Sequence, residues 1–217
     1  MTATSPERRV PASAAAMLHT SNLLTYASLL AGLSAMIAAS WYHNRSIAGM
    51  GMALMVVLDT FDGRFARRFV RTSAEREFGV QLDSLADAVN SGVVPVAVML
   101  GLLHAMSKPA AAMWIAAAFI YLLGVVTRLG FYNLTHEEGK IFVGLPAPVA
   151  ALAVATMLLW PVASLPTAIL MSAAGLAMIS PVRIPRPSGA GLFLFVLWPV
   201  VVFICHVSAG TLFRIPR

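Results

Sequence analysis

The stretch DTFDGRFAR (residues 59–67), followed after eleven residues by GVQLDSLAD (residues 79–87), contains all four aspartates of this 217-residue chain. Both stretches adjoin or enter apolar segments that are long enough to cross a bilayer. A carboxylate at membrane depth costs about 2.5–3.5 kcal/mol on insertion scales. Four carboxylates at one level therefore need a compensating cation, and a divalent metal ion is the natural candidate.

The composition is that of a membrane protein. The chain is 59% hydrophobic and 11% charged, whereas soluble domains have about 25% charged residues. Its net charge of +6 is better explained by arginines in cytoplasmic loops than by nucleic-acid binding. No basic helix or aromatic platform lies outside the apolar segments, so nucleic acid is not an expected partner.

Seven apolar segments predict an all-α polytopic membrane protein with six or seven spans. We expect a cytoplasmic N-terminal segment at residues 1–21, a single transmembrane domain at 22–207 and a basic tail at 208–217. The first segment is too long for a signal-peptide core and is interpreted as a retained span. The segments are Asn22–Trp41, Ile47–Phe69, Gly79–Leu103, Ala110–Phe131, Pro146–Val162, Leu165–Ile179 and Gly191–Val207. Pro199 could kink the last segment or divide it into a re-entrant pair.

Lysine and arginine are distributed unevenly between the two ends of these segments. With a cytoplasmic N-terminus, four basic residues fall on the outer side: Arg45, Lys108, Arg214 and Arg217. The other eleven fall on the cytoplasmic side, as the positive-inside rule requires: Arg8, Arg9, Arg64, Arg67, Arg68, Arg71, Arg76, Arg128, Lys140, Arg183 and Arg186. The sequence thus predicts a multi-pass protein of a prokaryotic cell membrane, with its aspartates facing the cytoplasm.

The spacing of the aspartates predicts one shared site. Asp59 and Asp62 are three residues apart and Asp83 and Asp87 four apart, so each pair lies on one helix face. Two antiparallel helices joined by a loop can place these pairs opposite each other across a groove. Such an oxygen-rich site suits Mg²⁺ or Mn²⁺, and two divalent ions would nearly neutralise four carboxylates.

Small residues and an arginine accompany the aspartates. Gly63 would let a substrate approach the backbone, Ala66 lies on the same face, and Arg67 suits phosphate oxygens. Together with two metal ions they form a pattern typical of phosphate transfer. The alternative, in which neighbouring arginines only neutralise the aspartates as ion pairs, stays open for any single pair.

These residues resemble the motif of the CDP-alcohol phosphotransferase family, and all eight fixed positions are met. The spacer between Arg67 and Gly79 has eleven residues where the family usually has eight. Because the extra residues shift the loop, either Thr72 or Ser73 is the loop hydroxyl that would contact a nucleotide phosphate. The positions that match are Asp59, Asp62, Gly63, Ala66, Arg67, Gly79, Asp83 and Asp87.

The resemblance implies a homodimeric, all-helical membrane enzyme with a six-helix transmembrane core, which leaves the seventh segment as an additional C-terminal span, and with a site that opens to the cytoplasm. The four aspartates would bind two Mg²⁺ or Mn²⁺ ions, and Asp87 would also be the general base. Residues implied to bind the CDP-lipid are Asn22, Thr25, Asp59, Gly63, Ala66, Arg67, Ser73 and Gly79. For Asn22 and Thr25 an ordinary helix cap and a helix polar residue are equally good interpretations.

Four further stretches resemble the phosphatidylserine synthase branch of the family: LDSLADAVNSGVVP (82–95), RLGFYN (128–133), FVGLPAP (142–148) and MISPVRIP (178–185). The branch implies transfer of the phosphatidyl group from CDP-diacylglycerol to L-serine, with release of CMP. Arg128, Asn133 and Arg183 are candidates for binding the acceptor, although the arginines also fit the positive-inside rule.

Two alternatives are kept. The same chemistry could use another acceptor, such as glycerol 3-phosphate, inositol or an inositol phosphate. More distantly, intramembrane aspartates could form the ion path of a divalent-cation transporter. A transporter should have polar residues continuing across the membrane, but the outer halves of the second and third segments are apolar.

Overall fold

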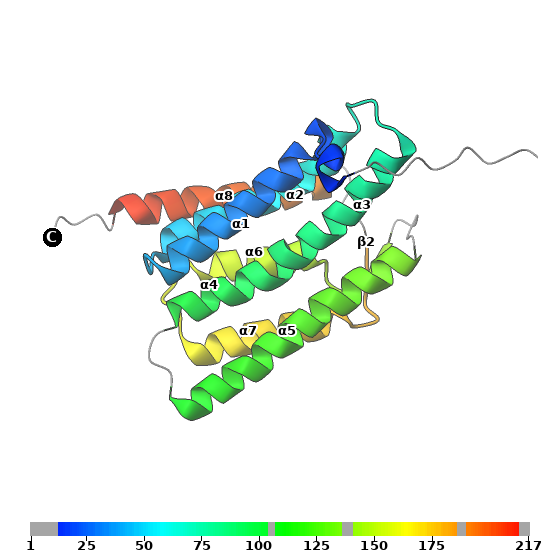
Figure 1. The fold of residues 1–217 in the computed structure, drawn as a ribbon. Helices are drawn as coiled ribbons and strands as arrows, with labels where there is room; N and C mark the ends of the chain where they lie inside the picture. The colour runs from blue at the N-terminus through cyan, green and yellow to red at the C-terminus, as the bar shows by residue number, and fades with distance from the viewer. Residues whose placement is uncertain (1–12, 104–106, 136–140, 186–189, 213–217) are drawn as a thin grey trace, which may run out of the picture.

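The computed structural model describes residues 13–103, 107–135, 141–185 and 190–212, and within them the chain is an all-α polytopic membrane protein (Figure 1). Two short 3₁₀ turns, η1 (Ala14–Met17) and η2 (Thr20–Asn22), precede the first helix. The α-helices are α1 (Leu23–Ser40), α2 (Arg45–Ala66), α3 (Ser73–Asp87), α4 (Val94–Leu102), α5 (Lys108–Thr135), α6 (Ala147–Met157), α7 (Ser164–Met178) and α8 (Ala190–Leu212).

All seven predicted apolar segments are helical. Five helical stretches are long and apolar enough to cross a membrane: Thr20–Ser40, Arg45–Ala66, Ser73–Leu102, Lys108–Thr135 and Phe193–Gly210. α6 and α7 are shorter, with 11 and 15 residues. Of the basic residues used to predict orientation, Arg8, Arg9, Lys140, Arg186, Arg214 and Arg217 lie outside the described residues.

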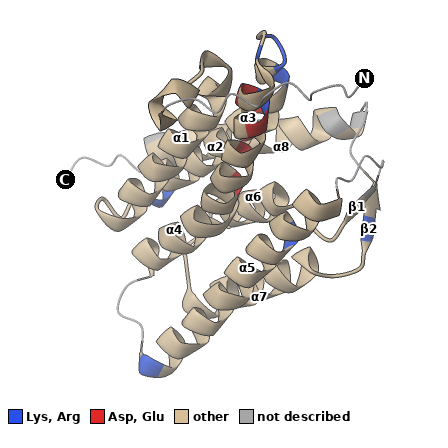
Figure 2. Ribbon diagram, turned by 45° about the vertical axis from the view of Figure 1, so that its right-hand side comes forward, with Lys and Arg blue, Asp and Glu red and all other residues tan. Residues whose placement is uncertain are grey.

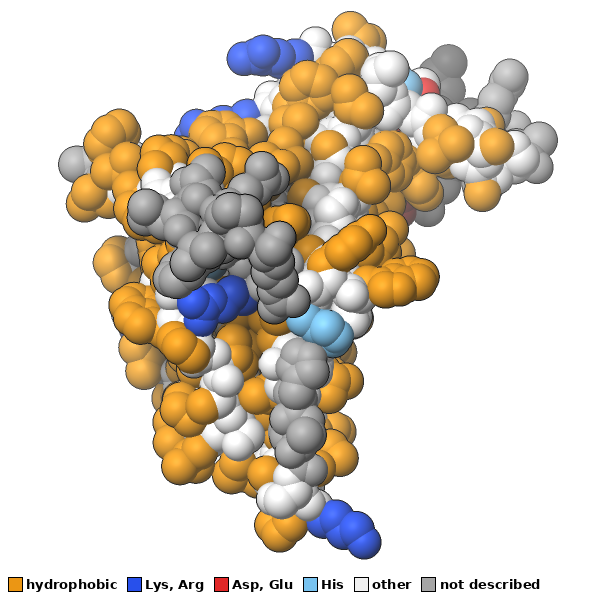
Figure 3. Space-filling view, turned by 90° about the vertical axis from the view of Figure 1, so that its left-hand side faces the viewer, with side chains coloured by type: hydrophobic (Ala, Val, Ile, Leu, Met, Phe, Trp, Pro, Cys, Tyr) orange, Lys and Arg blue, Asp and Glu red, His pale blue; other side chains and the backbone are white. Residues whose placement is uncertain are grey.

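Apolar side chains cover much of the outer surface, as expected where a protein faces lipid (Figure 3). Leu30 of α1 and Phe119 of α5 are each 64% exposed. α8 is one continuous helix through Pro199, so the structure does not contain the re-entrant pair that this proline could have produced.

The third helix begins at Ser73, six residues before the predicted start at Gly79. A capping box explains this difference: the backbone N–H and the hydroxyl of Thr72 donate to the Glu75 carboxylate, and the Glu75 N–H donates to the Thr72 hydroxyl. Over half of the eleven-residue spacer is therefore helical. The TSAE sequence that marks this start was visible at residues 72–75.

A π-helical turn, η3 (Ala88–Val93), joins α3 and α4 into one long rod immediately after Asp87. Pro95 has no N–H, so the carbonyl of Ser91 four residues earlier loses its helical donor. The hydroxyl of Tyr121 in α5 donates to that carbonyl at 2.7 Å. The completely buried Tyr121 thus satisfies a backbone group that the proline leaves without a partner.

Small residues allow the helices to approach closely. A Cβ added to Gly124 of α5 would lie 2.5 Å from the carbonyl oxygen of Gly175 in α7. Gly49 of α2 is covered by the ring of His206 in α8, whose Nε2 lies 2.9 Å from the carbonyl oxygen of Ala155 in α6. Backbone approach of this kind is a main source of stability between membrane helices.

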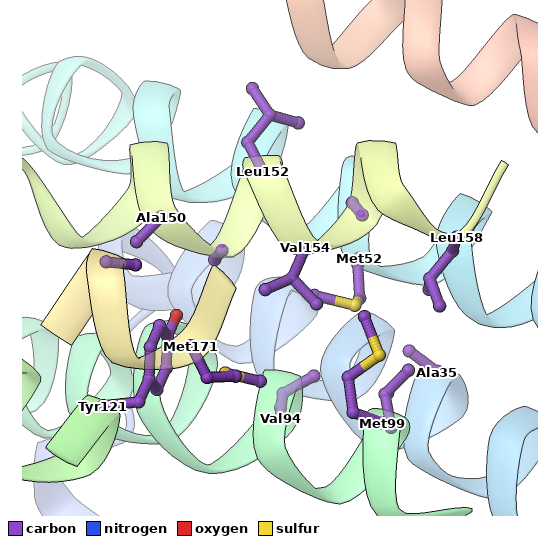
Figure 4. Packing of buried hydrophobic residues seen from close by; sticks show 14 of the residues in the cluster. Ala35, Met52, Val94, Met99, Tyr121, Ala150, Leu152, Val154, Leu158 and Met171 are labelled. Atoms are coloured by element: carbon purple, nitrogen blue, oxygen red, sulfur yellow. The ribbon is translucent and has the colours of Figure 1, made fainter. Parts of the chain in front are cut away.

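The centre of the bundle is α6, which packs against α2 and η3. Four of its alanines and Leu152 are completely buried, and methionines fill the space around them (Figure 4): the alanines are Ala147, Ala150, Ala151 and Ala155. The end of α2, the starts of α1 and α3 and the end of α5 lie together at one end of the bundle (Figure 1). A two-stranded antiparallel ribbon, β1 (Ile141–Val143) with β2 (Arg183–Pro185), lies at this end as well.

We predict that Tyr121→Phe lowers the free energy of unfolding by about 1–3 kcal/mol, because it leaves the buried Ser91 carbonyl without a donor. Thermal unfolding of the detergent-solubilised protein measures the effect. Tyr26→Phe is the matched control, since its buried hydroxyl has no hydrogen-bond partner among the described residues. Equal stability changes in the two variants would contradict this account of the π-turn.

Candidate functional site

The structure brings the four aspartates together at the junction of α2 and α3. The side chain of Asp59 lies against that of Asp87, and the side chain of Asp62 lies against that of Asp83. The acidic residues lie close to the basic loop between these helices (Figure 2). Each pair thus contains one aspartate from either helix, as the i+3 and i+4 spacings predicted.

Two carboxyl groups in such contact need a shared proton or a cation, because two adjacent negative charges repel strongly at low dielectric. In the described part of the chain, no three His, Cys, Asp or Glu residues already form a ready metal-binding group. The carboxylates instead form two pairs. Among the described residues, Oδ1 of Asp59 is buried and has no hydrogen-bond partner, and this all-oxygen donor set fits Mg²⁺ or Mn²⁺.

Thr25 of α1 holds one of these carboxylates in place. Its hydroxyl donates to Oδ2 of Asp62 at 2.9 Å, and both side chains are more than nine-tenths buried. Asn22 occupies the N-cap position of α1, but its side chain makes no capping hydrogen bond. Neither residue therefore has only the ordinary helix role that the sequence left open.

A cavity of about 350 Å³ opens beside Asp62 and Asp83. Six of the eight residues predicted to bind the CDP-lipid line it: Asn22, Thr25, Gly63, Ala66, Arg67 and Gly79. Arg71 and Arg76 line it as well and were not predicted as site residues. The capped start of α3 could have revealed Arg76, because it places residues 76, 79 and 83 on one helix face.

The two glycines of this cavity differ in their surroundings. A Cβ on Gly79 would lie 3.3 Å from Nη1 of Arg71 and 3.4 Å from Oδ1 of Asn22, so two side chains of the cavity already surround this position. A Cβ on Gly63 would meet only the guanidinium of Arg67, at 3.7 Å. Gly63 therefore leaves open space in the cavity and is not required by packing.

Two residues predicted for this cavity do not line it. Ser73 is exposed at the first position of α3, and the neighbouring Thr72 hydroxyl is engaged with Glu75. The start of α3 thus engages the Thr72 hydroxyl as a helix cap, and the contact of Ser73 with a phosphate stays a prediction. Asp59 lines a different cavity on the other side of the aspartates.

That second cavity has a volume of about 580 Å³ and is lined by Asp59, Asp83, Asp87 and Arg128. Asp83 thus borders both cavities. The remaining walls are mostly apolar and come from α2, α5, α6, α8, the β-ribbon and the connection between β1 and α6: Thr60, Leu129, Tyr132, Phe142, Leu145, Pro146, Pro148, Val149, Ile184, Pro185 and Phe195.

Arg128 is the only one of the three predicted acceptor residues that lines this cavity. It is 8% exposed, its guanidinium lies 5.8 Å from the ring centroid of Phe142, and its charge acts on Asp87. Asn133 instead exchanges hydrogen bonds of 3.1 and 3.3 Å with Ser84 of α3. Arg183 is exposed on β2. Because successive side chains of a strand point to opposite faces, the next residue, Ile184, lines the cavity and Arg183 does not.

Comparisons with known proteins agree with this arrangement. The CDP-alcohol phosphatidyltransferase family model matches residues 18–182. The CDP-diacylglycerol–serine O-phosphatidyltransferase of Mycobacterium tuberculosis is 35% identical over 142 residues, which are 62% of this chain and 47% of that protein. The archaetidylserine synthase of Methanothermobacter thermautotrophicus is 33% identical over 141 residues, 64% of this chain and 58% of that protein.

A Methanocaldococcus jannaschii CDP-diacylglycerol–serine O-phosphatidyltransferase is 27% identical over 176 residues, 81% of this chain and 78% of that protein. The chain spans about half the length of the mycobacterial relatives that it matches. The family model, by contrast, covers most of this chain and includes all four aspartates. The chain therefore belongs to the CDP-alcohol phosphatidyltransferase family.

Proposed function

We propose that this protein transfers the phosphatidyl group from CDP-diacylglycerol to L-serine and releases CMP. The observation that supports this most directly is the position of four aspartates between a cavity with three arginines and a largely apolar cavity with Arg128. The names of the relatives describe the same reaction, or an archaeal counterpart of it.

The nucleotide end of the donor fits the first cavity. Arg67, Arg71 and Arg76 there can bind phosphate oxygens, which guanidinium groups do through paired donors. Gly63 leaves room for the donor to approach the backbone of α2, as its open surroundings allow. Asn22 and Thr25 close the cavity from the α1 side.

The family is generally dependent on divalent metal ions. We propose that Asp59, Asp62, Asp83 and Asp87 would hold two Mg²⁺ or Mn²⁺ ions, which when bound polarise the phosphorus and offset the charge of the pyrophosphate. Thr25 keeps one oxygen of Asp62 in a fixed direction.

Asp87 is the residue proposed to act as general base. It lies in the second cavity near Arg128, which can receive the carboxylate of serine. Asp87 accepts the proton of the serine hydroxyl while that oxygen attacks the phosphorus bearing diacylglycerol. A new P–O bond forms, the bond from this phosphorus to the CMP oxygen breaks, and CMP leaves into the arginine-lined cavity. The apolar walls suit the acylglycerol part of the donor.

We further propose that the site faces the cytoplasm and that the enzyme is a homodimer, as the family resemblance implies. The basic loop between α2 and α3 supports this orientation. A transporter is not supported, because Met52, Met55, Val98 and Met99 are almost completely buried in an apolar core beyond the aspartates. Such packing offers no polar path to the far side.

Release of CMP from CDP-diacylglycerol by the purified protein tests the proposed reaction. We expect release with serine, but not with glycerol 3-phosphate, inositol or an inositol phosphate. EDTA should stop it, and Mg²⁺ or Mn²⁺ should restore it. Asp87→Asn is the negative control, which should still bind the CDP-lipid without releasing CMP. Release with another acceptor in place of serine would refute the proposed specificity.

We predict that Gly63→Ala weakens CDP binding without destabilising the protein. The added methyl group enters the first cavity, while alanine is a better helix former by about 0.8–1.0 kcal/mol. Calorimetric titration with CDP and thermal unfolding measure the two effects. Gly130→Ala is the matched control, because a Cβ there meets nothing within 4 Å and lies outside both cavities. Unaltered CDP affinity in Gly63→Ala would argue against nucleotide binding in this cavity.

We predict that Asp59→Asn is at least as stable as the unaltered protein in EDTA, because it relieves the repulsion between Asp59 and Asp87. Added Mg²⁺ should then stabilise the unaltered protein but not the variant. Thermal unfolding with and without Mg²⁺ measures both effects. A variant that is less stable in EDTA, or that responds normally to Mg²⁺, would contradict the proposed role of Asp59.

A further inference from the structure

A line of buried hydrogen bonds connects the π-turn to the aspartates through α1. The amide Nδ2 of Asn90 donates to Oγ of Ser28 at 2.9 Å. The Ser28 hydroxyl donates to the backbone carbonyl of Thr25 at 2.8 Å, and the Thr25 hydroxyl donates to Asp62 at 2.9 Å. The four side chains are between 0 and 7% exposed.

We propose that Asn90 and Ser28 are positioning residues that fix the aspartates of α2 and α3 relative to each other and thereby set the affinity for divalent cations. This inference rests on the proposed function, since it concerns the same site. Neither residue lines either of the two cavities beside the aspartates. Both therefore act through other groups rather than on the substrates.

The geometry of the π-turn makes Asn90 well placed for this role. Asn90 follows Asp87 by three residues in the same continuous rod, so a displacement of Asn90 also displaces Asp87. A π-turn contains one residue more than an α-turn and rotates the helix before it relative to the helix after it. The direction of the α3 carboxylates thus depends on how this turn is held.

α1 is shaped to hold the turn. A Cβ on Gly32 would lie 3.0 Å from Oδ1 of Asn90 and 2.9 Å from Cγ2 of Val94. Gly32 therefore lets the π-turn and the start of α4 pack directly on α1, one helical turn beyond Ser28. On the opposite side, Tyr121 of α5 bonds the Ser91 carbonyl. Contacts with α1 and with α5 thus hold the π-turn on two sides.

The contacts of Asn90 do not look optimised for stability alone. Its Oδ1 is buried and has no hydrogen-bond partner among the described residues. An acceptor in that condition costs free energy, and an apolar pair of similar shape at positions 28 and 90 would avoid that cost. A connection that reaches Asp62 gives a reason for polar residues at both positions.

The test measures cation binding directly, without turnover. The complete protein is purified in detergent, and its affinity for Mn²⁺ is determined by electron paramagnetic resonance of the free ion. We expect Ser28→Ala and Asn90→Ala each to weaken Mn²⁺ binding by up to about tenfold, the effect typical of losing a hydrogen bond made directly to a metal ligand. The Mn²⁺ affinity of the double variant should be close to that of the single variant with the lower affinity, because both substitutions interrupt the same line of hydrogen bonds.

Ser34→Ala is the matched control, since Ser34 also lies on α1 but is exposed, and its hydroxyl donates to the Leu30 carbonyl rather than toward the aspartates. Its Mn²⁺ affinity should not change. Unchanged affinity in Ser28→Ala overturns the inference even if Asn90→Ala fails to fold, and so does a loss of thermal stability without a change in affinity. If the unaltered protein binds no Mn²⁺, the proposed metal site is refuted together with this inference.

Discussion

The contact between carboxyl groups of α2 and α3 is the constraint on which the rest of the site depends. Asp59 meets Asp87 and Asp62 meets Asp83, in a region where negative charge is poorly solvated. Bringing these carboxyl groups together costs free energy on folding, because their negative charges repel each other. The surrounding elements supply what opposes this repulsion: close packing of α1 on α2, a hydroxyl from Thr25, and arginines on the adjoining loop.

The supporting structure is concentrated on one side of the aspartates. Toward the far end of the bundle the core consists of alanine, valine and methionine around α6. Toward the near end, the two cavities and the β-ribbon take the place of a packed core. The apolar core at the far end stabilises the bundle. The near end can therefore contain charged side chains and two cavities.

The sequence was most informative where function and spacing coincide. The i+3 and i+4 aspartates, Gly63 and Arg67 could be assigned to one site because helical geometry converts spacing directly into position. Asn133 and Arg183 could not be placed in this way, since their positions depend on contacts between distant segments: Ser84 on α3 and the pairing of β1 with β2. Arg76 could have been assigned from the capping box that begins α3 at Ser73, whereas Arg71 lies in the loop before this helix and the Tyr121–Ser91 bond depends on tertiary packing.

The shortness of α6 has a consequence for the membrane itself. Eleven helical residues rise about 16 Å, roughly half of the 30 Å hydrocarbon thickness. Because Pro146, Pro148 and Val149 at its beginning line the larger cavity, this cavity lies where further turns of a longer α6 would continue the helix. A water-borne amino acid and a bilayer-borne lipid could meet there without either one leaving its own phase entirely.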